Sequence, residues 1–146
     1  MPPFVHKFKY FFYDEELELE CPDSFIEQFC LCLNSKLSFQ KKEIIQYGEM
    51  ADALYFIKEG IVYARLEERE EVFYIEEGSW FGDYQIMLNL RSNFSFCAKS
   101  DIVTLIYIKR NKLNELLSDN PLINKLMQRR AIHRRKAFIE HEFHYR

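Results

Sequence analysis

The sequence lacks the residue patterns on which several common protein classes depend. It has only four cysteines in 146 residues, with no C-x-x-C pair, and Cys30 and Cys32 would point to different sides of a helix. A zinc site or a disulfide framework is therefore poorly supported. No apolar run approaches the roughly 18–20 residues of a membrane span, and the opening residues lack the cleavage site of a signal peptide. We expect the chain itself to be soluble and intracellular.

An excess of positive charge and the usual catalytic motifs are also missing. Twenty basic and 23 acidic residues give a net charge of −3, so no global field indicates nucleic acid or anionic lipid as a partner. The chain has no nucleophile elbow, Walker loop or Cys–His pairing of catalytic spacing. Every histidine lies outside residues 37–108, which argues against a metal centre there: His6, His133, His141 and His144. We predict a protein that is not an enzyme and holds no metal or cofactor.

Apolar and aromatic residues are abundant enough for one compact domain. Hydrophobic residues make up 48% of the chain, and the aromatics are 14 Phe, 9 Tyr and one Trp. A chain of this length buries roughly 68–70% of its unfolded surface around one core. We interpret residues 1–22, an aromatic and basic cluster followed by an acidic run over 14–20, as a connecting segment, and residues 23–146 as the domain.

The domain opens with a helical pattern and continues with a period of two. Ser24 and Glu27 have the spacing of a capping box, and the apolar residues that follow predict a helix over about 24–33. From 37 to 108, short apolar runs alternate with turns, and all four glycines fall in this stretch. This pattern predicts an antiparallel β roll, with a short helix after Gly82 and the run IVTLIYI passing through the middle of the core.

The helical period returns at Lys109. One short helix ends at Asn120, and Pro121 suits the first turn of a second helix over about 121–140, since the missing N–H of proline would be unpaired there. The fold class is therefore α+β: a jelly-roll-like β roll with an N-terminal helix, a short helix after Gly82, and two C-terminal helices within 110–140.

This order of elements, together with four short motifs, resembles the cyclic-nucleotide-binding domain family. The resemblance runs from about Asp23 to Ile139 and is strongest to the C-terminal domains of cyclic-nucleotide-gated, hyperpolarisation-activated and ether-à-go-go-type cation channels. The motifs are Phe39-Gln40, Ile44-Ile45-x-x-Gly48-Glu49, Leu54-Tyr55-Phe56-Ile57-x-x-Gly60-x-Val62 and Gly78-x-x-Phe81-Gly82-Asp83.

The resemblance implies a phosphate-binding cassette over residues 81–92. In the family, backbone N–H groups at the start of the short helix bind the cyclic phosphate, because unpaired amides and the helix dipole favour an anion. An acidic residue after Phe-Gly accepts the ribose 2′-hydroxyl, and an arginine followed by Ser or Thr neutralises the phosphate. The ligand-binding residues implied here are Phe81, Gly82, Asp83, Tyr84, Arg91 and Ser92. The last helix would close over the base as a lid, with Arg130 and Arg134 as candidate contacts.

The arginine departs from the family pattern and leaves two functions open. Arg91 stands one position early when counted from Asp83 and two positions early when counted back from IVTLIYI, where Asn93 holds the usual place. If the loop absorbs the shift, the domain binds cAMP or cGMP and couples lid closure to gating. Otherwise it is a ligand-silent module that regulates by self-occlusion, with Glu142-Phe143-His144-Tyr145 as a candidate plug, or by subunit contacts.

The same resemblance implies the partners and the location. We expect the cytoplasmic side of a membrane, as part of a tetrameric, potassium-type channel, with the membrane reached only through the parent protein; a regulatory module of a non-channel protein is the alternative. Three interpretations are open for the basic residues of 125–136: a solvated helix face, contacts with the base of the nucleotide, or ion pairs with a neighbouring subunit. The acidic run over 14–20 could meet such a stripe across an interface.

Overall fold

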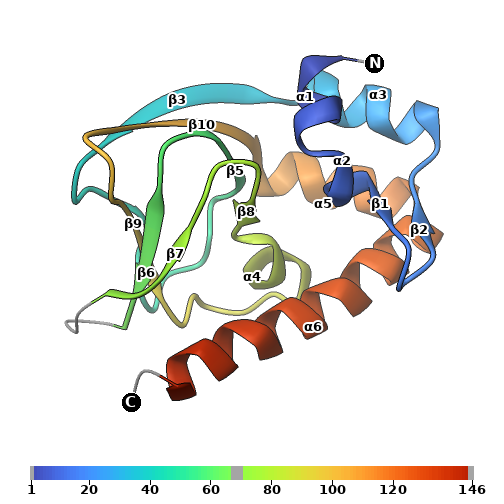
Figure 1. Cartoon of the computed structure of the whole chain (residues 1–146). Helices are drawn as coiled ribbons and strands as arrows, with labels where there is room; N and C mark the ends of the chain where they lie inside the picture. Colours follow the sequence, from blue (N-terminus) through green and yellow to red (C-terminus); the bar gives the residue numbers. More distant parts are fainter. Residues whose placement is uncertain (1, 67–70, 145–146) are drawn as a thin grey trace.

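The computed structural model describes the backbone of residues 2–66 and 71–144 and the side chains of 2–66 and 73–140. A β roll forms one half of the molecule, and helices form the other half and its lower edge (Figure 1). In chain order the helices are α1 (Pro3–Lys7), α2 (Lys9–Phe12), α3 (Asp23–Leu31), α4 (Asp83–Met87), α5 (Arg110–Asp119) and α6 (Pro121–His144). The predicted α+β class and its two C-terminal helices are confirmed, and the final helix runs four residues further than expected.

Two four-stranded antiparallel sheets make up the roll. Their orders are β3-β10-β5-β8 and β4-β9-β6-β7. The strands are β3 (Asn34–Phe39), β4 (Glu43–Ile45), β5 (Ala53–Glu59), β6 (Val62–Arg65), β7 (Glu71–Ile75), β8 (Trp80–Phe81), β9 (Ser95–Ala98) and β10 (Ile102–Lys109). The apolar run IVTLIYI falls in β10, which pairs with β3 on one side and β5 on the other, as its nearly continuous hydrophobicity predicted.

The N-terminal stretch, for which the sequence predicted no elements, is folded against the domain. Helices α1 and α2 lead into a two-stranded hairpin, β1 (Tyr13–Asp14) and β2 (Leu19–Glu20). Phe8, Phe11 and Phe12 are at most 1% exposed and lie in the same core as the roll. The rings of Phe8 and Phe11 each lie 5.0 Å from that of Phe56 in β5, so this stretch packs as part of the core. The division at residue 22 remains a prediction.

Helix α3 begins one residue earlier than predicted and without the expected capping box. Pro22 occupies the N-cap position with extended backbone, and no side chain caps the helix. The pattern of Ser24 and Glu27 was therefore misread, because the chain already turns helical at Asp23, after the fixed φ of proline.

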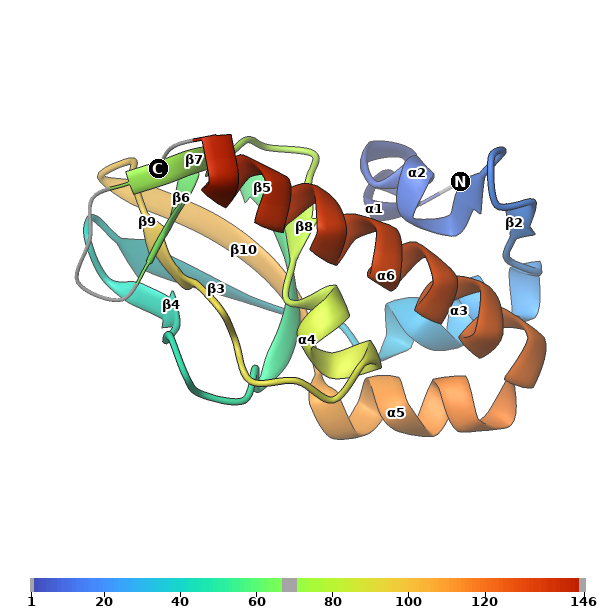
Figure 2. The ribbon, with the colours of Figure 1, turned by 90° about the horizontal axis from the view of Figure 1, so that it is seen from below.

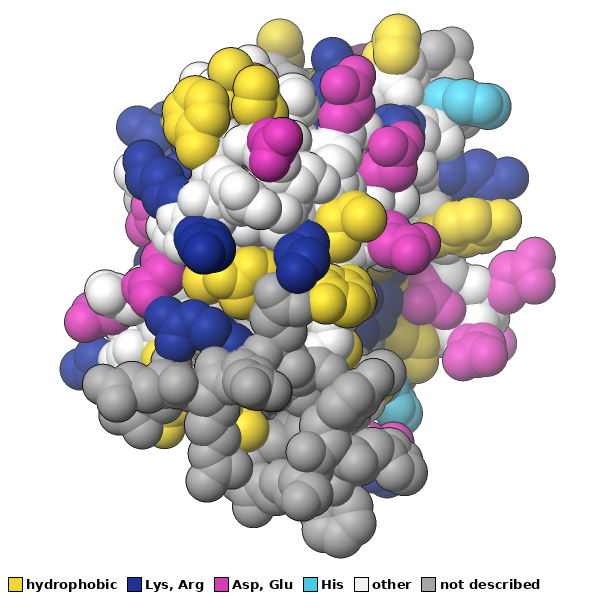
Figure 3. Space-filling model, turned by 60° about the vertical axis from the view of Figure 1, so that its left-hand side comes forward, with side chains coloured by type: hydrophobic (Ala, Val, Ile, Leu, Met, Phe, Trp, Pro, Cys, Tyr) yellow, Lys and Arg dark blue, Asp and Glu magenta, His cyan; other side chains and the backbone are white. Residues whose placement is uncertain are grey.

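Helix α6 is the longest element and crosses beneath the roll. It passes along α4 and extends from the end near β7 to the side where the hairpin and α3 lie (Figure 2). Ile123, Met127 and Ala131 on its inner face are at most 6% exposed. On the roll side, the coloured side chains show separate hydrophobic patches divided by charged residues (Figure 3).

Candidate functional site

The site is built on a tight turn between β8 and α4. Gly82 has a φ of +94°, and a Cβ atom there would lie 2.8 Å from the carbonyl oxygen of Ala53, so a side chain would both strain the backbone and collide with β5. Phe81 is fully buried and pairs with Tyr55 of β5. The turn therefore fixes the start of α4, whose first backbone N–H groups lack intrahelical partners.

Asp83 is the first residue of α4, and its carboxylate is buried. The residue is 2% exposed. Its Oδ2 accepts a hydrogen bond of 2.7 Å from Nε of Arg134, and Nη2 of Arg134 donates to the carbonyl oxygen of Trp80, also at 2.7 Å. Oδ1 of Asp83 is buried and has no hydrogen-bond partner among the described residues. One carboxylate oxygen is therefore held by α6, while the other remains an acceptor for a hydroxyl group.

The side chains of Tyr84 and Gln85 are buried inside the cassette. The Tyr84 hydroxyl donates to Oδ1 of Asn93 at 2.5 Å, and burial raises the pKa of Tyr84 well above its usual range, so the phenol stays neutral. The count along the sequence had predicted Asn93 at the position where the family usually has its arginine. Gln85 is fully buried, with its Nε2 3.5 Å from Oγ of Ser92 and its Oε1 unpaired among the described residues. Sequence reasoning missed Gln85, because no motif marks it.

Arg91 and Ser92, at the end of the cassette, have side chains in different environments. Arg91 is exposed, and its guanidinium donates to the carbonyl oxygen of Gly48 at 3.1 Å. Ser92 is buried, and its hydroxyl donates to the carbonyl oxygen of Phe94 at 2.6 Å. The structure thus brings Phe81, Gly82, Asp83, Tyr84 and Ser92 together on the side of the roll that faces α6, whereas Arg91 lies on the surface and bonds to the carbonyl oxygen of Gly48.

Phe138 of α6 completes the covering of the site. Its ring packs against four aromatic rings of the roll and cassette, with centroid distances of 5.0 Å to Phe73, 5.4 Å to Tyr84, 6.2 Å to Phe94 and 6.3 Å to Phe96. Phe138 lies within the helix predicted over about 121–140, but the sequence did not indicate what its side chain contacts. The side chains of the tail named as a candidate plug lie outside the described residues.

Arg130, one turn before Arg134, contacts the N-terminal helices. It is 6% exposed and donates to the carbonyl oxygens of Tyr10 at 3.0 Å and Phe11 at 2.8 Å. Its guanidinium carbon lies 4.9 Å from the ring centre of Phe11 and 5.3 Å from that of Trp80. Burial lowers the pKa of Arg130, although Asp83 opposes this effect. The two candidate lid arginines therefore donate hydrogen bonds to different partners, although both guanidinium groups lie over the ring of Trp80.

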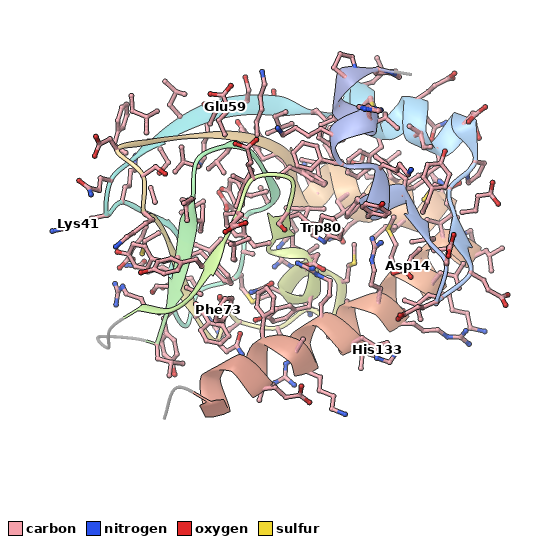
Figure 4. All side chains as sticks on the ribbon, in the orientation of Figure 1. Asp14, Lys41, Glu59, Phe73, Trp80 and His133 are labelled. Atoms are coloured by element: carbon pink, nitrogen blue, oxygen red, sulfur yellow. The ribbon has the colours of Figure 1, made fainter. Side chains whose placement is uncertain are left out.

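Two hollows flank Trp80. A small one of about 300 Å³ is lined by residues that include Phe73, Trp80, Arg134 and Phe138. A larger groove of about 810 Å³ lies between the hairpin and α6, with Asp14 on one wall and His133 on the other. In Figure 4, Asp14 and His133 lie on either side of this opening, and Phe73 lies above the last turns of α6. No group of three or more His, Cys, Asp or Glu side chains among the described residues could hold a metal ion.

The family assignment follows from this geometry and from one sequence match. Residues 37–120 match the model of the cyclic nucleotide-binding domain. The chain belongs to the cyclic nucleotide-binding domain family. Domains of this family are regulatory and take a cyclic nucleotide as a ligand, not as a cofactor. No curated protein matches the chain in sequence. Among the described residues, no helix combines the length and hydrophobicity that crossing a membrane requires.

Two solved structures show the same fold at low sequence identity. The C-linker/CNBHD of zELK channels, crystallised in the presence of cAMP, is 17% identical with a TM-score of 0.69, over 91% of this chain and 70% of that one. The regulatory domain of Toxoplasma gondii PKA with cAMP is also 17% identical, with a TM-score of 0.63 over 75% of this chain. This chain spans 42% of the length of that regulatory domain.

Proposed function

We propose that this chain is the regulatory domain of a cyclic-nucleotide-modulated cation channel of the potassium type, and that α6 competes with cAMP or cGMP for one site. The observation that carries the proposal is the pair formed by Arg134 and Asp83, together with Phe138 seated on Tyr84. Asp83 is the acidic residue that follows Phe-Gly, where the family binds the ribose. An incoming nucleotide would have to displace these α6 side chains.

The channel assignment rests on how much of this chain the similarity to a channel domain covers. The likeness to the zELK channel domain covers 91% of this chain. It therefore takes in most of the part before residue 37, where the family model begins. A module attached to a gate needs such a connection, and α1, α2 and the hairpin would provide it. A ligand shifts an equilibrium between two arrangements only by its difference in affinity for them, so release of α6 would pass to the gate through this N-terminal part.

A second candidate, the ligand-silent domain, is favoured by the position of Arg91. An anion left without its cation loses about 2–5 kcal/mol of binding free energy. The guanidinium of Arg91 is bound to the carbonyl oxygen of Gly48, and Asn93, which is uncharged, is bound to Tyr84. Neither residue therefore supplies a positive charge at the start of α4. In that case, α6 would be a permanent occupant of the site.

The test compares Phe138→Ala with Ile132→Ala, a matched control that removes an exposed side chain from the same helix. Binding of cAMP and cGMP would be measured by titration calorimetry, with thermal unfolding to confirm that each variant folds. We expect Phe138→Ala to bind at least tenfold more tightly than the wild type, a gain of about 1.4 kcal/mol, and the control to match the wild type.

Each other outcome decides between the alternatives. Tenfold weaker binding by Phe138→Ala would mean that Phe138 contacts the nucleotide as a lid, and would overturn competition. If millimolar nucleotide gave no heat of binding and no rise in the unfolding temperature, in either the wild type or Phe138→Ala, the domain would be ligand-silent. Arg91→Ala is expected to leave the affinity within about twofold. A tenfold loss would instead restore the phosphate role indicated by motif order.

A further inference from the structure

The outer surface of α6 carries a row of basic side chains that form no ion pair with any described residue. Lys125, Arg129 and Lys136 are exposed, and none forms a salt bridge with any residue in the described part of the chain. Leu122 and Ile132 on the same surface are 68% and 57% exposed. At 1.5 Å per residue, this outer basic face, residues 122–136, is about 21 Å long. It points away from Arg130 and Arg134, which belong to the inner face.

The hairpin of β1 and β2 carries the opposite charge. Glu15, Glu16, Glu18 and Glu20 are exposed, and no salt bridge within the described residues involves them. Glu18 has a φ of +54°, which places it in the turn. The acidic hairpin, residues 13–20, therefore presents four carboxylates on a short, tightly turned element that is anchored to the core by Leu19.

The acidic hairpin and the outer basic face adjoin each other. Glu20 and Leu122 line the same groove of about 680 Å³. Glu15 and His133 line the groove of about 810 Å³ on the other side of the hairpin. Two adjacent patches of opposite charge form a self-complementary surface, because a two-fold rotation brings each patch of one copy onto the opposite patch of the other.

We propose that this surface binds a second copy of the chain, with the acidic hairpin of each copy on the outer basic face of the other. A nucleic acid or an anionic membrane attracted by α6 would meet the carboxylates beside it, whereas a second copy satisfies both signs at once. Leu122 and Ile132 would supply apolar area, since exposed ion pairs alone contribute little to the free energy of association. The proposal is independent of nucleotide binding and of the channel assignment.

The experiment is sedimentation of the purified chain at several concentrations in 50 and 500 mM salt. We expect a dimer at low salt whose dissociation constant rises at least tenfold at high salt, because salt screens the attraction between the opposite charges. Two charge-reversed variants follow. The first carries Glu15→Lys, Glu16→Lys and Glu18→Lys, and the second carries Lys125→Glu, Arg129→Glu and Lys136→Glu.

Mixing the variants provides the decisive readout. Each alone should be monomeric, because both of its patches then have the same sign, and the equimolar mixture should recover the dimer. A matched control reverses three exposed acids elsewhere, Glu27→Lys, Glu59→Lys and Asp101→Lys, and should dimerise like the wild type. A wild type that stays monomeric at low salt, a reversed variant that still dimerises, or a folded mixture that stays monomeric would each overturn the proposal.

Discussion

At the scale of single residues, Arg130 and Arg134 of α6 have different hydrogen-bond partners, and Arg130 is buried whereas the side chain of Arg134 is 23% exposed. Arg134 is joined to the carboxylate of Asp83 and also donates to the carbonyl oxygen of Trp80, whereas Arg130 donates to two main-chain carbonyls of α2. A buried guanidinium needs its donors satisfied. Arg130 meets this requirement with backbone atoms of α2, so its contribution should appear in stability first.

Arg130→Met tests this role. Methionine keeps most of the apolar contact with Phe11 and Trp80 but leaves the carbonyls of Tyr10 and Phe11 without their donor, so we expect a loss of about 2–4 kcal/mol in the free energy of unfolding. Urea denaturation measures it. The matched control, Arg129→Met on the exposed neighbour, should change the free energy by no more than about 0.5 kcal/mol. Equal effects of the two substitutions would contradict the assignment.

Cys21 predicts a dependence of stability on alkaline pH. Burial raises the pKa of its thiol from 9.0 to about 12, an effect that the charge of Arg130 partly offsets. Between these values the folded state keeps a proton that the unfolded chain releases, so stability falls as the pH rises from about 9 to about 12. The wild type should lose about 1 kcal/mol per pH unit more than Cys21→Ala over pH 9–10.5 in urea denaturation. Parallel pH profiles would refute the prediction.

At the scale of elements, α6 is held to the cassette by few polar contacts. The ion pair between Arg134 and Asp83 joins residues 51 positions apart. Arg134→Gln should therefore raise the amide hydrogen-exchange rates in the second half of α6 at least tenfold, while the ladder between β5 and β10 keeps its protection. Lys136→Gln, an exposed change two residues nearer the C-terminus, is the control. Unchanged exchange in Arg134→Gln would show that apolar packing alone holds the helix.

The elements with a clear period could be predicted from the sequence, and the elements without one could not. Alternation and the four glycines indicated the roll, and Asn120-Pro121 marked the break between α5 and α6, because each of these is a local property of the chain. The N-terminal stretch escaped prediction because α1 and α2 have five and four residues, too few to show a helical repeat.

The site divides in the same way. Gly82 and Asp83 could be identified because a motif fixes the turn and the carboxylate that follows it. The partners supplied by α6 could not, since they depend on where a helix that begins 38 residues later crosses the roll. Arg134 had been a candidate contact for the ligand, and the structure gives it a protein partner instead. Whether a nucleotide takes over that contact remains a prediction.

At the scale of the whole molecule, the N-terminal stretch and the roll share one core. Phe4, Phe8, Phe11 and Phe29 all lie within about 6 Å of the ring of Phe56. A chain reduced to residues 23–146 would lose three of these rings and leave a cavity beside β5. Each large-to-small change of a buried phenylalanine costs about 3–5 kcal/mol.

The truncated chain should therefore unfold at a midpoint at least about 10 °C below that of the full chain, or lose its cooperative transition. Differential scanning calorimetry of the two chains at equal concentration measures the difference. A full chain carrying Tyr10→Ala, whose side chain is 72% exposed, is the control and should unfold like the wild type. An unchanged midpoint in the truncated chain would instead support the predicted boundary at residue 22.

Arg130 and Arg134 stand one turn apart on one unbroken helix, about 6 Å along its axis. The first is tied to the N-terminal helices and the second to the cassette, so α6 acts as a stiff lever between them. A force applied to the N-terminal helices would therefore pass through about one helical turn to Asp83. Because linkage is reciprocal, the affinity of the site for its occupant would vary with that load, and the domain would report tension as well as concentration.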